Sequence, residues 1–117
     1  MCMRDESITT KDRLQHIIEA IEEIETFTVT YTKESFLKDS KVINATLFQF
    51  AIIGEAIRNV DRAILEKYAY PWHKVIGFRN FILHEYHAIS FRIVWEAIQG
   101  DLPELKNLIK KILSKEF

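Results

Sequence analysis

Glycine and proline, the residues with which chains usually turn, are nearly absent from this sequence, which has 3 glycines and 2 prolines in 117 residues. A β-sandwich or β-barrel needs turn residues about every 8–12 positions, so this count argues against an all-β fold. Instead, apolar residues recur three, four and seven positions apart over long segments, which is the spacing of a helix with one buried face. The sequence therefore predicts an all-α domain.

Capping residues indicate where the helices predicted from the apolar spacing begin and end. Thr32 is expected to cap a short helix, and Ser90 is expected to cap a helix that ends at Gly100. Asp101, with Glu104 three positions later, resembles a capping box at the start of the last helix. Four or five main helices joined by short loops predict an antiparallel bundle. The expected helical segments, short ones included, are residues 11–26, 34–37, 40–60, 61–68, 72–86, 91–99 and 101 onward.

The length of the chain corresponds to a single domain. Residues 1–10 are expected to form a flexible leader, and residues 11–117 one helical domain, because no linker or repeat interrupts them. Within this domain, residues 40–60 are apolar around nearly the whole circumference of the expected helix. Such a pattern is typical of the central helix of a bundle, or of a helix that meets a partner chain.

Charge and cysteine content exclude several classes of function. Lysine and arginine number 16 against 17 aspartates and glutamates, so nucleic-acid binding would need a local basic patch. The single cysteine, Cys2, excludes an internal disulfide and a multi-cysteine zinc site. The first residues are too polar for a signal peptide, and no apolar run reaches the roughly 18–20 residues that cross a membrane. We therefore expect a cytoplasmic protein without membrane contact.

The local basic patch is expected between residues 70 and 95. Lys74, Arg79 and Arg92 are accompanied there by a single acidic residue, Glu85. A polyanion would favour this window over the rest of the chain. Titratable nitrogens are added by the three histidines His73, His84 and His87.

The centre of this window concentrates polar side chains on one edge of a helix. Arg79 and Tyr86 are seven positions apart, which places them within about 20° of each other on an ideal helix. Asn80 and His84 are four positions apart and lie one above the other on a neighbouring face. A guanidinium presents a permanent charge and a fork of donors to phosphoryl oxygens, and an imidazole can move a proton near neutral pH. This polar edge of the helix is therefore suited to binding a phosphate group and to moving a proton beside it.

The order of these residues resembles the R-x4-H-x-Y motif of the HEPN superfamily of ribonuclease domains, here Arg79 to Tyr86. Three further segments narrow the resemblance to the HepT-like (DUF86) toxins of HEPN/MNT toxin–antitoxin pairs. They are Ile53-Gly54-Glu55-Ala56, the Pro71-Trp72 segment that runs to Gly77 and Arg79-Asn80, and Asp101-Leu102-Pro103-Glu104-Leu105. All four signatures occur in the expected order between about residues 12 and 112, so the resemblance covers nearly the whole chain.

The resemblance implies a homodimeric helical bundle in which two such motifs meet in a cleft at the dimer interface. It implies a metal-independent endoribonuclease toxin that cleaves cellular RNA (tRNA or mRNA) and not DNA, without a cofactor. Its antitoxin would be a minimal nucleotidyltransferase that transfers AMP to a tyrosine. By position, Arg79 and His84 are the expected catalytic pair, Asn80 a supporting residue, and Tyr86 the AMPylation target. From the residues themselves, Glu55 is a carboxylate among apolar neighbours that is costly unless paired, so we expect it to support the site by orienting Arg79 or capping the cleft.

Structural interpretations stand beside these roles. Arg79 could serve as an ion-pair partner of Glu55, and Tyr86 as a half-buried packing residue. His84, Glu85 and His87 offer a weak metal-ligand pattern with no fourth ligand nearby. At the level of the whole chain, the alternative to a toxin is a non-catalytic HEPN helical module that binds a nucleotide or assists a nucleotidyltransferase partner.

Overall fold

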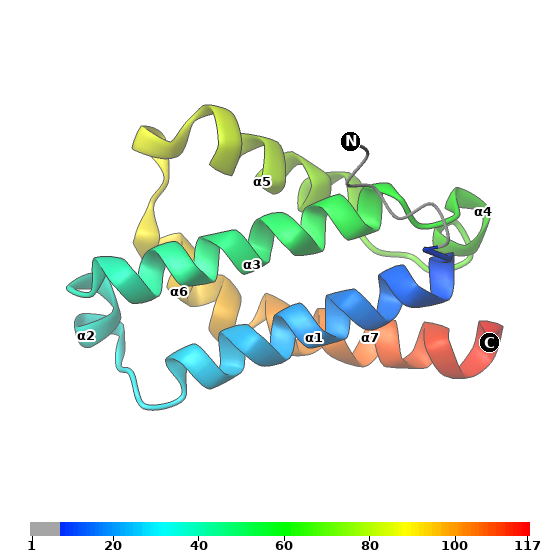
Figure 1. Cartoon of the computed structure of the whole chain (residues 1–117), viewed down its shortest axis with the longest axis horizontal. Helices are drawn as coiled ribbons and strands as arrows, with labels where there is room; N and C mark the ends of the chain where they lie inside the picture. Colours follow the sequence, from blue (N-terminus) through cyan, green and yellow to red (C-terminus); the bar gives the residue numbers. More distant parts are fainter. Residues whose placement is uncertain (1–7) are drawn as a thin grey trace, which may run out of the picture.

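All regular elements of the described chain are helical. The computed structural model describes residues 8–117, which contain seven α-helices, one 3₁₀ helix and no β-strand (Figure 1). The predicted all-α fold is therefore confirmed. The elements are α1 (Thr10–Thr28), α2 (Lys33–Leu37), α3 (Ser40–Arg58), α4 (Arg62–Leu65), α5 (Trp72–His84), η1 (Tyr86–Ala88), α6 (Phe91–Gln99) and α7 (Asp101–Glu116).

Helix α3 lies at the centre of an antiparallel arrangement. It packs between α1 on one side and α5 on the other, and α7 packs on α1 (Figure 1). The short helices α2 and α6 close one end of the bundle against α3 and α7. Because α3 and α5 run in opposite directions, the start of α3 lies near the end of α5. This pairing decides which residues of α3 face the motif on α5.

Both ends of α1 differ from the sequence-based boundaries. Thr9 caps the helix in a reciprocal capping box with Asp12, so the helix begins at Thr10 and the expected flexible leader does not extend to these residues. The rest of that leader, residues 1–7, lies outside the described residues. At the other end, α1 continues to Thr28, because the buried Thr28 hydroxyl donates to the Ile24 carbonyl at 2.8 Å. A satisfied hydroxyl allows this β-branched residue to stay helical.

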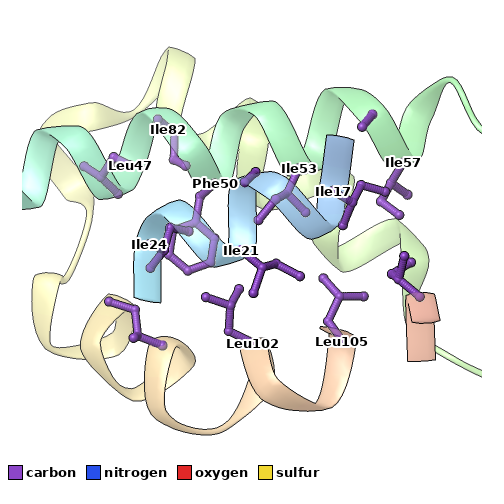
Figure 2. Packing of buried hydrophobic residues seen from close by; sticks show 14 of the residues in the cluster. Ile17, Ile21, Ile24, Leu47, Phe50, Ile53, Ile57, Ile82, Leu102 and Leu105 are labelled. Atoms are coloured by element: carbon purple, nitrogen blue, oxygen red, sulfur yellow. The ribbon is translucent and has the colours of Figure 1, made fainter. Parts of the chain in front are cut away.

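The hydrophobic core lies where α1, α3 and α7 face one another (Figure 2). Isoleucines of α1 interlock with the buried side of α3, and leucines of α7 close the core from below in that view. The apolar character of residues 40–60 thus reflects a helix with packed neighbours on two sides. Phe48 is the exception, because 65% of its surface is exposed. The labelled core residues are Ile17, Ile21, Ile24, Leu47, Phe50, Ile53, Ile57, Ile82, Leu102 and Leu105.

Helix α5 ends two residues earlier than the spacing predicts. The last α-helical residue is His84, and Glu85 leaves the helical region at φ −129° and ψ 36°. Tyr86 begins the 3₁₀ turn η1 instead of continuing α5. The prediction that Arg79 and Tyr86 share one helical face is therefore wrong. The physical reason is tertiary, since Tyr86 bonds to α3 and the chain must turn there toward α6.

The expected capping box at the start of α7 is also wrong. Gly100 is the N-cap of α7, and no side chain caps this helix. The Gly100 N–H closes α6 by donating to the Glu96 carbonyl at 3.0 Å, so a single residue separates the two helices. Asp101 consequently lies inside the first turn of α7, where a carboxylate meets the positive end of the helix dipole. The caps predicted at Thr32 and Ser90 are both confirmed.

Candidate functional site

Arg79 lies where α5 packs tightly against α3. Gly54 on α3 faces it, and a Cβ added to Gly54 would lie 2.3 Å from the Arg79 Cβ and 3.1 Å from the Val75 carbonyl oxygen. No side chain fits at this distance, so the glycine allows α5 to lie directly against α3. In the sequence, Gly54 stands out only as part of the Ile53-Gly54-Glu55-Ala56 signature. Its role as the contact that positions Arg79 depends on pairing between the two helices.

Two contacts hold the Arg79 guanidinium. Its Nη2 lies 3.1 Å from Glu55 Oε2, and its Nη1 donates to Asn80 Oδ1 at 2.8 Å. The side chain is 21% exposed, so one edge of the fork reaches solvent. An arginine has five N–H groups, and the two contacts leave others free for a ligand. The group is thus a positive charge of fixed orientation.

Glu55 is itself anchored on α3. Its Oε1 accepts a hydrogen bond from Asn59 Nδ2 at 3.1 Å, and the same amide donates to the Glu55 backbone carbonyl. The Oε2 atom is buried and has no hydrogen-bond partner of good geometry, so the nearby Arg79 charge is what compensates it. Arg58 approaches the same oxygen at 3.9 Å from solvent. The ion pair between Arg79 and Glu55, one of the interpretations of the sequence, is therefore present.

Asn80 and His84 follow Arg79 along α5, and both side chains are exposed. His84 is the last residue of the helix. Arg79 and His84 are five positions apart, which on an α-helix corresponds to about 140° of rotation and about 7.5 Å of rise. Within residues 8–117, no hydrogen bond or ion pair joins these two side chains. One copy of the chain holds them on the same helix but does not bring them together.

Tyr86 lies just beyond this helix and reaches back to α3. Its hydroxyl donates to Asn44 Oδ1 at 2.6 Å, and its ring meets His87 edge-on at 5.9 Å between centroids. The residue is 41% exposed. Asn44 was not among the residues singled out from the sequence. No local pattern could have found it, because the contact joins residues 42 positions apart.

An apolar cavity of 390 Å³ lies elsewhere, between α3, α5, α6 and α7. Phe50, Phe78 and Leu105 form part of its wall, and none of the motif residues lines it. Tyr70 stands at its edge, where burial and then the carboxylates of Glu104 and Asp101 raise the pKa of the phenol. The cavity is therefore separate from the polar site on α5.

Metal binding and membrane crossing are the alternatives that the geometry of residues 8–117 addresses. Three or more histidine, cysteine, aspartate or glutamate side chains never come close enough together in this range to hold a metal ion, and the pattern at His84, Glu85 and His87 forms no such group. Among the helices in the same range, none is sufficiently long and apolar to cross a membrane.

Comparisons with known proteins identify a family and several relatives that resemble this chain. The family model described as "Ribonuclease HepT-like" matches residues 17–112. A protein of Caldanaerobacter subterraneus subsp. tengcongensis named "Putative RNase TTE0752" is 35% identical over 109 residues, which cover 92% of this chain and 97% of the relative. "Probable ribonuclease HepT" of Thermococcus cleftensis is 35% identical over 103 residues, which cover 87% of this chain and 94% of the relative. No solved structure matches.

Proposed function

The chain belongs to the ribonuclease HepT-like family, and from this membership we propose that it is a metal-independent endoribonuclease with Arg79 and His84 as its catalytic residues. The observation that carries the proposal is the fixed guanidinium of Arg79. It is seated against Gly54, paired with Glu55 and Asn80, and carried by the same helix as an exposed histidine. A surface arginine without such a role would need neither the glycine nor the buried carboxylate oxygen.

RNA supplies its own nucleophile, so no metal-bound water is required. The 2′-oxygen attacks the neighbouring phosphorus, the bond from phosphorus to the 5′-oxygen breaks, and a 2′,3′-cyclic phosphate and a 5′-hydroxyl result. An imidazole in the position of His84 takes the 2′-hydroxyl proton or protonates the leaving oxygen, which contributes about 10²- to 10⁴-fold in rate. The Arg79 guanidinium stabilises the charge that builds up on the phosphoryl oxygens in the transition state.

A homodimer would complete this site. Arg79 and His84 are turned about 140° from each other on α5, so one chain does not aim both at one phosphate. In a symmetric dimer, His84 of one chain can face Arg79 of the other, and each site then receives both groups. Support comes from large apolar side chains exposed at and beside the motif. Phe48, Phe81, Leu83 and Tyr86 are exposed over 65%, 38%, 54% and 41% of their surfaces.

Tyr86 is the proposed site of regulation by a minimal nucleotidyltransferase antitoxin, as in a type VII-like toxin–antitoxin pair. The phenolic oxygen attacks the α-phosphorus of ATP, pyrophosphate leaves, and the phenolic proton passes to a base of the transferase. The product carries adenylate bulk and a negative phosphodiester two residues after His84. Both properties oppose RNA binding, because the new charge competes for Arg79 and the nucleoside fills the approach to the site. The exposure of Tyr86 supports this proposal.

An RNA cleavage assay in EDTA tests the enzyme proposal. Wild type is expected to cleave, whereas His84→Ala is expected to be inactive with an unchanged circular dichroism spectrum, because His84 is exposed at a helix end. Cleavage by the alanine variant at the wild-type rate would refute the catalytic role. If neither protein cleaves, and intact mass shows that wild type carries no adenylate, the non-catalytic module becomes the better description.

A further inference from the structure

A single side-chain hydrogen bond ties the segment after His84 to the rest of the bundle. Within residues 8–117, Tyr86 to Asn44 is the only side-chain hydrogen bond that connects residues 85–89 with another helix. The backbone bonds of this segment are local, from Glu85 to Phe81 and within the turn itself. Apart from the packing of Ile89 on the core, the Tyr86 hydroxyl is therefore the anchor of the chain just after His84.

The chemistry of this bond makes it sensitive to the covalent state of Tyr86. The phenol is the donor, and Asn44 Oδ1 has only lone pairs to offer. Any group attached to the phenolic oxygen removes the proton that lies between the two atoms. Two acceptor oxygens 2.6 Å apart repel each other, so this hydrogen bond is lost.

We propose that Asn44 is a positioning residue that holds His84 in its working place through the Tyr86 hydroxyl, and that a substituent on this hydroxyl releases the segment from α3. The inference rests on the proposed function, since it deepens the regulation of the same site. Modification of Tyr86 then acts in two ways. It obstructs the site, and it also detaches the turn that fixes the end of α5.

We call the hydrogen bond between Tyr86 and Asn44 the clamp. Three variants of the full chain distinguish loss of the clamp from a general effect of changing a surface residue. Asn44→Leu removes the acceptor at nearly constant size, Tyr86→Phe removes the donor, and Asn44→Asp keeps an acceptor. Asn107→Leu places the same apolar side chain at an exposed position of α7 and serves as the control. Because Asn44 is also exposed, none of these changes creates a cavity in the core.

The first readout is amide hydrogen exchange of residues 85–90, measured by NMR without RNA. Asn44→Leu and Tyr86→Phe are each expected to accelerate exchange about 2- to 10-fold, as for the loss of one hydrogen bond. The double variant should show no further acceleration, and Asn44→Asp should restore most of the protection. Equal exchange in all variants and in wild type would overturn the proposal.

The second readout is steady-state RNA cleavage. Asn44→Leu and Tyr86→Phe are expected to lower kcat by a similar factor of about ten with little change in KM, since the clamp orients a catalytic group and does not bind substrate. Faster exchange with unchanged kcat would show that the clamp does not position His84 and would also overturn the proposal. A wild type that cleaves no RNA refutes the proposed enzyme, while the exchange measurement still decides whether the clamp holds this turn.

Discussion

Gly54→Ala is the substitution for which the structure makes the sharpest prediction. An alanine Cβ would lie 2.3 Å from the Arg79 Cβ, which is part of the rigid base of that side chain. To reach an ordinary contact of about 3.4 Å, α3 and α5 must move apart by about 1.1 Å at this point. The shift falls on the residue that carries the guanidinium, so stability and activity should change together.

The magnitude follows from two opposing effects. Alanine is favoured over glycine in a helix interior by about 1 kcal/mol. Overpacking of a close contact costs about 1–3 kcal/mol, so the free energy of unfolding should fall by up to about 2 kcal/mol. A displacement of about 1 Å at a catalytic group lowers the rate by about 10²-fold. We therefore expect a modest loss of stability with a large loss of RNA cleavage.

Gly77→Ala is the matched control on α5. A Cβ at Gly77 meets nothing within 4 Å, so only the helix preference acts and stability should rise by about 0.5–1 kcal/mol. Urea unfolding followed by circular dichroism gives both free energies, and cleavage is measured on the same samples. If Gly54→Ala is as stable as Gly77→Ala and cleaves at the wild-type rate, the close contact does not position Arg79 and the reasoning fails.

Further predictions concern the ion pair, a helix cap, the core and the exposed face. Glu55→Gln keeps the shape of the side chain but removes the charge that faces Arg79. Because this side chain is half exposed, we expect the free energy of unfolding to fall by less than about 1 kcal/mol. RNA cleavage should fall at least about ten-fold, since the guanidinium is no longer held in place. The hydrogen bond from the Tyr31 hydroxyl, and then that from the Val42 amide, lower the pKa of Asp39 below 3.8. The carboxylate of Asp39 therefore stabilises the fold at a pH above 3.8, and this stabilisation is lost as the pH falls through the lower pKa of the folded state. Urea midpoints of wild type and Asp39→Asn should accordingly differ at neutral pH and converge below about pH 4; a constant difference would contradict this. Phe36→Ala empties a fully buried site beside Trp95 and should cost about 3–5 kcal/mol in urea unfolding, whereas a cost below about 1 kcal/mol would show that the site collapses. Phe48→Glu should shift the proposed dimer to monomer in analytical ultracentrifugation without lowering helix content, and an unchanged mass would place the interface elsewhere.

Local features of the fold were predictable from the sequence, and features that need two distant segments were not. The caps at Thr32 and Ser90 follow from residues within three positions, so their prediction succeeded. The end of α5 could not be predicted, because Tyr86 leaves the helix for a partner on α3. The predicted cap of α7 was wrong because Asp101, a residue that often caps helices, directly follows Gly100. Gly100 ends α6 and is itself the N-cap of α7.

The candidate site shows the same division. The pairing of Arg79 with Glu55 was one interpretation of an isolated carboxylate among apolar neighbours, and the structure contains it. Gly54 and Asn44 become meaningful only when α3 and α5 are placed antiparallel. The catalytic roles of Arg79 and His84 and the modification of Tyr86 remain predictions.

The angle between Arg79 and His84 on α5 affects how cleavage activity depends on the concentration of the chain. If one phosphate needs the arginine of one chain and the histidine of another, a single chain is half an enzyme. Below the dissociation constant of the dimer, the number of complete sites then grows with the square of the chain concentration, by mass action. A cell that makes few copies would hold almost no active enzyme, and a tenfold rise in copies would raise cleavage about a hundredfold. The geometry of one helix would in this way set an expression threshold for the whole protein.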